Sequence, residues 1–495
     1  MSWKEAAEPV LTRMPVVERP AGHVPFKRKL AWTAGILIVY FFLTNINPFG
    51  LAAGQGTDFF GQFRSVLAGE HGSLLQVGIG PIVTASIVLQ LLGGANLLGL
   101  DTNDPRDQIL YQGLQKLLVI IVTALTAAPM VFTGGFLPSD PAVATALGIG
   151  EFGVELLIFT QVFIGGVLIL FMDEIVSKWG VGSGVGLFII AAVSQQIIGG
   201  FFSFSALGET GFFASWFGII MGDVPLESPL TPTGLEQLLF QPGQVLALFT
   251  TLFIFGIVVY AESVRVEIPL SHARVKGARG RFPVKLIYAS VLPMILVRAL
   301  QANIQFFGQI LNSQWTSWRG GMPEWLGVYG DQGEPLSGFF YYMNPIQQPT
   351  EWMWFLGEIP ATVEPWMIAV RITIDLTFMV IGGAIFAIFW VETTGMGPEA
   401  TARQIQNSGM QIPGFRRNPQ VVEKVMERYI PQVTVIGGAL VGLLAVMANM
   451  LGTIGQVSGT GLLLAVSITY KLYEEIAEEQ LMEMHPMMRQ MFGNE

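Results

Sequence analysis

Few residues in this chain have the types and spacing that chemistry requires. The chain contains no cysteine and four histidines, which excludes disulfides, thiolate nucleophiles and zinc–thiolate sites and disfavours a multi-histidine metal site. Two glycine-rich runs, 180–186 and 452–461, lack the Gly-Lys-Ser/Thr ending of a phosphate-binding loop. They fit tight turns and close helix approaches better. We therefore expect no enzyme activity, no metal and no cofactor.

Ionisable residues within apolar segments are the second group of candidates, because charges at membrane depth are costly and usually functional. These residues are Lys116, Arg298, Arg371 and Asp375. Lys116 is close enough to the end of its segment for its ammonium group to reach water. Arg371 and Asp375 are one helical turn apart, so we expect them to pair on one helix face, with an ion-coupling site as the alternative. Arg298 has no partner in its own segment.

The elements that must hold these residues are membrane helices. Of the 495 residues, 52% are hydrophobic and 13% are charged, against roughly 25% charged in a soluble domain. The mean hydropathy of +0.55 leaves room for about ten apolar spans of ~20 residues. Apolar runs lie near residues 30–51, 74–92, 114–132, 152–172, 185–204, 245–260, 286–310, 366–390, 433–451 and 457–470. The sequence thus predicts an all-α polytopic membrane protein with ten transmembrane helices.

The distribution of lysine and arginine orients these helices, since cytoplasmic loops keep the positive charge. Basic residues are concentrated in the amphipathic leader 1–29 and in the loops 261–285 and 391–431. The long loops 205–244 and 311–365 are acidic, with Arg319 as their single basic residue. We therefore expect both termini, including the tail 471–495, to be cytoplasmic. The first span follows an amphipathic leader, and no small-residue cleavage motif follows Leu43, so we expect this span to be retained as a membrane helix and not cleaved as a signal peptide.

Five spans lie in an N-terminal half, 30–204, and five in a C-terminal half, 245–470, with the external loop 205–244 between them. An odd number of spans per half gives the halves opposite orientations, and inverted halves commonly enclose a pathway at their interface. The net charge of −10 resides mostly in the loops. Such acidity suits the salt-rich cytoplasm of a halophile, with ordinary drift in loop composition as the alternative.

A short segment between the first two spans, 57–71, has helical spacing of apolar residues but cannot cross a membrane, so it folds back into the protein or lies on the membrane surface. Five motifs follow it: Gly78-Ile-Gly-Pro-Ile-Val-Thr, Asp173-Glu-Ile-Val-Ser-Lys-Trp-Gly, Arg265-Val-Glu-Ile-Pro-Leu, Phe389-Trp-Val-Glu-Thr-Thr-Gly and Arg428-Tyr-Ile-Pro. In this order they closely resemble the SecY family, the large subunit of the protein-conducting channel, in its archaeal branch. The resemblance covers residues 10–490.

The resemblance implies two halves that open like a clamshell, a plug helix and a central ring of aliphatic side chains. The plug would be about residues 58–69, with Asp58, Phe59, Phe60, Phe63, Arg64, Val66 and Leu67. The ring would be Ile79, Val83, Val185, Ile189, Ile295 and Leu464. Branched apolar side chains around a constriction offer ions no ligands and favour dewetting. Taken singly, the ring residues fit ordinary helix packing better, so the ring assignment rests on the resemblance. The sequence of the plug segment is equally compatible with an interfacial amphipathic helix.

The family also implies a lateral gate toward lipid, formed by spans two and three against seven and eight. Polar residues near this seam would be Thr84 and Asn303, while a third position that is often acidic is Thr126 here. The basic loops resemble the family's ribosome-docking surface, with the residues Arg274, Lys276, Arg279 and Arg416. The positive-inside rule is a sufficient alternative explanation for these charges.

The expected function is that of the central pore-forming subunit of a protein-conducting channel in the cytoplasmic membrane. It would translocate secretory polypeptides and release transmembrane segments laterally into lipid. Expected partners are small SecE-like (gamma) and beta subunits, the ribosome, nascent chains with signal sequences, and the lipid bilayer. The alternative function is an inverted-repeat secondary transporter for a small solute.

Overall fold

The computed structural model describes residues 8–484 except 23, 53–60, 62, 95–97, 100–104, 134–135, 204–210, 224, 226, 229, 241, 273–278, 286–291, 320, 331–332, 355–362, 395, 408–409 and 412–418. Within this part of the chain ten long helices correspond to the ten expected spans. They are α2 (Phe26–Thr44), α4 (Gly80–Gly94), α5 (Pro105–Phe132), α7 (Gly150–Trp179), α8 (Gly184–Phe202), α11 (Val245–Ser263), α12 (Leu292–Arg319), α14 (Pro365–Thr393), α16 (Pro419–Leu451) and α17 (Gly459–Met484).

Six of these helices, α5, α7, α8, α11, α14 and α16, are by themselves long and apolar enough to cross a membrane. Several helices extend beyond the apolar runs: α16 begins at Pro419 and α17 continues to Met484, whereas the runs span 433–451 and 457–470. Hydropathy marks only the apolar part of a helix, and backbone hydrogen bonding continues into the polar turns beyond it. The observed helices therefore differ from the expected spans mainly at their ends.

Shorter elements connect the long helices. They are α3 (Arg64–Leu67), α6 (Pro141–Leu147), α9 (Phe212–Met221), α10 (Pro232–Leu239), β1 (Arg265–His272), β2 (Arg279–Lys285), β3 (Val328–Tyr329), β4 (Pro335–Ser337), α13 (Phe339–Tyr342), η1 (Pro349–Glu351), α15 (Pro398–Asn407), β5 (Met410–Gln411) and η2 (Ile454–Gln456). The five short strands lie in loops between helices, so the expectation of an all-α protein holds for the helical body and misses these strands.

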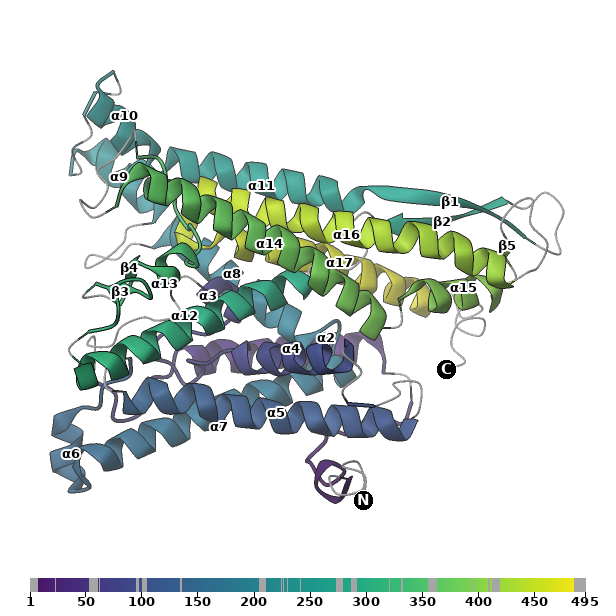
Figure 1. Cartoon of the computed structure of the whole chain (residues 1–495), viewed down its shortest axis with the longest axis horizontal. Coiled ribbons are helices and arrows are strands. Elements are labelled where there is room, and N and C mark those ends of the chain that lie inside the picture. Colours follow the sequence, from purple (N-terminus) through teal and green to yellow (C-terminus); the bar gives the residue numbers. More distant parts are fainter. Residues whose placement is uncertain are drawn as a thin grey trace.

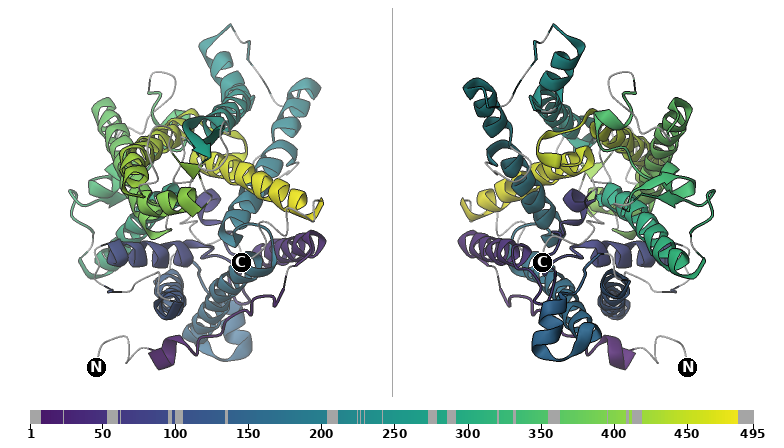
Figure 2. Two further views of the ribbon diagram at one scale, coloured as in Figure 1. Left: turned by 90° about the vertical axis from the view of Figure 1, so that its right-hand side faces the viewer. Right: turned by 90° about the vertical axis from the view of Figure 1, so that its left-hand side faces the viewer.

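The helices form two layered groups that follow the two halves of the sequence (Figure 1). The helices α2, α4, α5, α7 and α8 belong to one half, and α11, α12, α14, α16 and α17 to the other. The halves meet where α4 packs against α12 and α14, and where α8 packs against α17. Figure 2, viewed from the two ends of the molecule, shows the short α3 between the two groups. An interface between two halves is thus the place to search for a site.

Several ion pairs tie together one end of the helix bundle. Lys29 at the start of α2 pairs with Glu479 near the end of α17, and Arg265 and Lys285 on the strands β1 and β2 both pair with Glu474. The strand pair extends from this end, where the described parts of both chain termini also lie (Figure 1). The first and last described segments of the chain therefore occupy the same side of the molecule.

Candidate functional site

The helix α3 lies in the interior, in contact with α8 from one half and with α12 and α17 from the other. Its residues Ser65, Val66 and Leu67 are buried, as is Phe63 just before it. Four of the predicted plug residues, Phe63, Arg64, Val66 and Leu67, thus lie in or beside α3. The other three, at positions 58, 59 and 60, fall outside the described residues. Within the described residues this helix is shorter than the expected segment 58–69.

Hydrogen bonds hold α3 on several sides. The Ser65 hydroxyl donates to Gln196 Oε1 of α8 at 2.6 Å and accepts from the Ser458 N–H at 3.2 Å. The Tyr40 hydroxyl of α2 donates to the Ala68 carbonyl at 2.9 Å. Arg64 and Glu70 form a local ion pair at 3.0 Å. Gln196 and Tyr40 belong to the N-terminal half and Ser458 belongs to the C-terminal half, so these bonds attach α3 to both halves.

Two glycines allow the chain to pass close to α3. Gly78 has φ +56°, and a Cβ there would lie 2.2 Å from the Leu67 carbonyl oxygen. Gly461 on α17 faces Ser65, where a Cβ would lie 2.4 Å from the Ser65 Cβ. Real Cβ atoms do not approach so closely, so only glycine permits these contacts. The glycine-rich run 452–461 thus serves a close approach, as its sequence suggested.

The six predicted ring residues come from four elements and belong to one continuous apolar cluster. Ile79, Ile189 and Leu464 are each 0% exposed, Val83 and Ile295 are buried, and Val185 is partly buried. The Ile79 N–H donates to the Leu67 carbonyl at 2.8 Å, which joins this cluster directly to α3. The structure therefore brings the six side chains into the core that surrounds α3.

Asp173 near the end of α7 positions the start of α8. Its Oδ1 accepts a hydrogen bond from the Val185 N–H at 2.9 Å, so it caps the exposed N–H groups of the α8 N-terminus from another helix. The next residue, Glu174, accepts from Lys116 at 2.8 Å and Lys178 at 2.6 Å. Lys116, expected to extend its ammonium group to water, instead forms this largely buried ion pair. The acidic pair in the motif that begins at Asp173 thus fixes the helices that carry the cluster.

The three predicted gate residues also come together. Asn303 Nδ2 on α12 donates to Thr84 Oγ1 on α4 at 2.9 Å, across the contact between the halves. Thr126 on α5 lines the same small pocket as these two residues, together with Leu67 of α3 and Ala299 of α12. A neutral, partly buried hydrogen bond of this kind contributes about 1 kcal/mol. The polar contact across this seam is therefore weak and adjoins α3.

The two basic loops meet through their backbones. The strand β1 pairs with β2 and also with β5, where Ser271 faces Arg279 on one side and Gln411 on the other. Arg279 begins β2 and is thus placed near the other loop. The remaining predicted docking residues, at positions 274, 276 and 416, fall outside the described residues.

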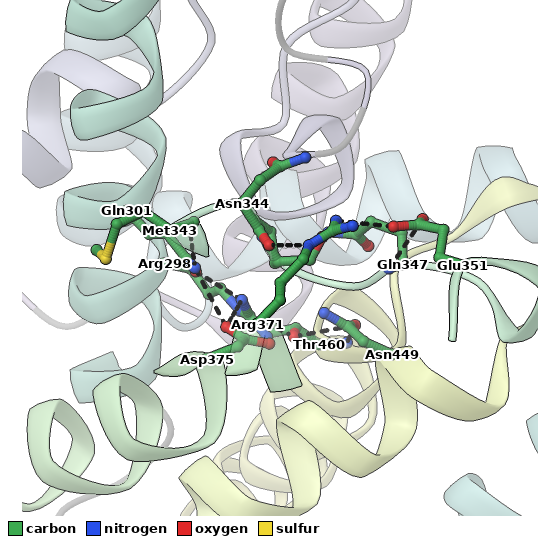
Figure 3. A network of polar contacts seen from close by, with 11 residues as sticks. Arg298, Gln301, Met343, Asn344, Gln347, Glu351, Arg371, Asp375, Asn449 and Thr460 are labelled. Carbon is green, nitrogen blue, oxygen red and sulfur yellow. Dashed lines mark hydrogen bonds and ion pairs between the residues drawn. The ribbon is translucent and has the colours of Figure 1, made fainter. Parts of the chain in front are cut away.

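The expected pairing of Arg371 with Asp375 is wrong. Arg371 pairs with Glu351 at 2.8 Å and donates to the carbonyls of Asn344 and Pro345 (Figure 3). Asp375 instead pairs with Arg298 of α12 at 3.2 Å, and both side chains are 1% exposed. One turn of spacing on a helix permits a pair, but two partners from neighbouring elements offer better geometry and more hydrogen bonds.

Arg298 lies at the centre of a buried polar network (Figure 3). It donates to Gln301 at 2.6 Å, to Asp375, and through Nε to Thr460 of α17 at 3.1 Å. Thr460 in turn is bonded to Asn449 of α16. Sequence reasoning left Arg298 without a charged partner because Asp375 lies on a helix that is distant along the chain, as does Thr460.

Comparison with known proteins decides the family. The family profile described as SecY matches residues 73–473. The chain belongs to the SecY family. A second profile, described as the plug domain of Sec61p, matches residues 38–72, which include α3. The resemblance read from the sequence motifs is confirmed.

Members of the SecY family match along the whole chain. The protein translocase subunit SecY of Haloferax volcanii is 74% identical and that of Halobacterium salinarum 70% identical, each over 100% of this chain and 100% and 99% of the relative. These relatives come from halophilic archaea. A solved structure described as a protein-conducting channel has a TM-score of 0.77 at 36% identity, over 97% of this chain and 98% of that chain. Sec61 in a canine ribosome-channel complex has a TM-score of 0.74 at 36% identity, with the same coverage.

Proposed function

We propose that this protein is the central pore-forming subunit of a protein-conducting channel. The observation that carries the proposal is the position of α3: a short helix lies between the two five-helix groups and is bonded to an apolar cluster contributed by both. Ring residues without polar groups would exclude ions at rest and deform around an arbitrary peptide. Since the chain has no nucleotide-binding motif, energy for translocation comes from elsewhere.

Lateral release of apolar segments would use the seam between α4 and α12. One short polar contact, between Asn303 and Thr84, crosses this seam beside α3. A transmembrane segment leaves sideways when lipid solvates it better than the channel does, and a weakly held seam permits this exit. By contrast, a small-solute transporter is not supported, because the buried charges Arg298, Asp375 and Arg371 bond to protein groups within one half.

Crosslinking tests the pathway directly, and the absence of native cysteine makes it specific. Val83→Cys and Ile295→Cys are each expected to crosslink to a single cysteine in a stalled nascent chain. Phe253→Cys is the matched control, since this α11 side chain is 58% exposed on the outer surface. Equal crosslinking at all three positions, or none at positions 83 and 295, would contradict a pathway through the cluster.

We also propose that the basic loops dock on ribosomal RNA at the cytoplasmic membrane, with both termini on the same cytoplasmic side. The pairing of β1 with β5 supports one continuous surface, because it joins the two basic loops through His272 and Met410, which are 138 residues apart in the sequence. Exposed arginine and lysine at this density suit phosphate contacts. Small SecE-like and beta subunits are the further proposed partners.

Docking should depend steeply on salt. Replacing Arg274, Arg279 and Arg416 together by glutamate is expected to weaken ribosome binding and flatten its salt dependence, since each lost phosphate contact removes a slope of about 0.7 to 0.9. Binding across a salt series measures both effects. Arginine forms bidentate phosphate contacts that persist at high salt, so Arg416→Lys should cost more there than Lys276→Ala. Equal losses for these two single variants would contradict the proposal.

A further inference from the structure

The two sides of α12 are attached to the protein in different ways. One face carries Ala299 and Asn303, which line the pocket beside Thr84 and Thr126, and Ser313, which contacts Thr133 after α5. Ile295, one turn before Ala299, belongs to the apolar cluster. Hydrogen bonds between described residues that join α12 to the N-terminal half include Asn303 to Thr84 at 2.9 Å and Ser313 to the Thr133 carbonyl at 3.4 Å. The second of these is long, so α12 is only weakly bonded toward α4 and α5.

The other face carries four polar residues at helical spacing, Arg298, Gln301, Gln305 and Gln309, here called the α12 ladder. The first three are at most 4% exposed. They form a row of bonds to the C-terminal half and to the segment before α14. Arg298 reaches Asp375 and Thr460, Gln301 reaches Asp375 and the Met343 carbonyl, Gln305 reaches the Phe340 carbonyl at 2.9 Å, and Gln309 reaches the Gly333 carbonyl at 2.8 Å.

Close packing between α12 and α14 reinforces the ladder. Gly382 and Gly383 of α14 face the α12 residues Val297 and Met294, and a Cβ on either glycine would come within 3.0–3.2 Å of these side chains. The small residues let the two helices approach closely. Among the residues that the structure describes, close packing and the six ladder bonds therefore attach α12 firmly to the C-terminal half.

The ladder is poorly suited to stability alone. Arg298 Nη2 and Asp375 Oδ2 are buried and have no hydrogen-bond partner among the described residues. A buried ion pair of this kind is often no more stabilising than an apolar pair of the same volume. Hydrogen bonds are directional, so they fix the rotation of a helix about its axis and its position along that axis. Apolar packing alone does not fix either of these.

We propose that the α12 ladder positions α12 as a fixed part of the C-terminal half, with Arg298 as its main positioning residue. It thereby holds Ile295 in the ring and Asn303 at the seam. When the channel opens sideways, the contact between α4 and α12 separates, whereas the contact between α12 and α14 stays intact. The external segment 333–343 moves with α12 because the ladder bonds its carbonyls. This inference rests on the proposed channel function.

The test uses the whole complex in liposomes and separates positioning from stability. Arg298→Met alone should lower the thermal midpoint, because it leaves Asp375 buried and unpaired. The double variant Arg298→Met with Asp375→Leu should restore the midpoint, because an apolar pair fills the same space. It should still export weakly hydrophobic signal sequences several-fold better than the parent, because α12 has lost its directional bonds.

Two further variants complete the design. Asn303→Leu, on the opposite face of α12, should tighten the closed seam. It should therefore raise the signal threshold, which is the lowest hydrophobicity at which a signal sequence is still exported, whereas the double variant lowers it. Gln305→Leu removes a single ladder bond and should shift the threshold like the double variant but less, which keeps the test available if the double variant does not fold.

The inference is overturned if the double variant has both the parental thermal midpoint and the parental signal threshold. It is also overturned if Gln305→Leu leaves the signal threshold unchanged. Failure of the proposed function looks different. In that case the parent itself neither exports signal-bearing chains nor crosslinks to them at positions 83 and 295.

Discussion

Replacing Ile79, Val83 and Ile295 together by serine is expected to open the resting channel to ions. Their side chains are at most 4% exposed within the apolar cluster, so three hydroxyls would place hydrogen-bonding groups where none exist now. If each hydroxyl stabilises water in the constriction by about 1 kcal/mol, the barrier to hydration falls by about 3 kcal/mol, or roughly a hundredfold in conductance. Conductance of single channels in planar bilayers measures the effect.

Loss of bulk must be separated from gain of polarity. The matched control is the triple alanine variant at the same positions, which removes similar volume without adding hydroxyls. Its conductance should rise less than that of the serine variant, because an apolar constriction still disfavours water. If the serine and alanine variants conduct equally, polarity is irrelevant there and the three residues only pack.

Gly461→Leu is expected to displace α3 and raise resting conductance by a comparable amount. The new side chain would occupy the space of Ser65, since even a Cβ at this position lies 2.4 Å from the Ser65 Cβ. Overpacking costs about 1–3 kcal/mol or more when the neighbours cannot move. Here the four-residue α3 gives way more readily than the long α17, whose first turn is bonded to Asn449.

The control and the rescue are both available in the chain. Gly199→Leu on α8 introduces the same side chain at a site where an added Cβ would have no atom of another element within 4 Å. Conductance should therefore stay at the parental value. Adding Ser65→Gly to Gly461→Leu removes the clashing atom and should lower the leak again, at least in part. A well-folded Gly461→Leu variant with parental conductance would show that α3 does not seal the channel.

The sequence alone predicted the ten long helices from its apolar runs, the family from the order of its motifs, and a short non-spanning segment that contains α3. Apolar runs, basic loops and motif order depend on residues near one another in the chain, and lipid imposes the same length and polarity on every span. The resemblance also predicted polar residues at a seam between helices, and the structure places two of them, Asn303 and Thr84, in a hydrogen bond between α12 and α4. Helix ends were less well predicted, since hydropathy falls before the helix stops.

Only the tertiary structure decided which charges pair and what holds α3. Arg298 and Asp375 are 77 residues apart, and Ser65 and Ser458 are 393 residues apart, so no local pattern connects either pair. Arg371 and Asp375 are one turn apart on α14, yet Arg371 pairs with Glu351 and Asp375 pairs with Arg298, because other elements pack beside them. In a medium that offers no water, a buried charge pairs with whatever groups the packing of the helices places beside it, and that packing is decided by the whole fold.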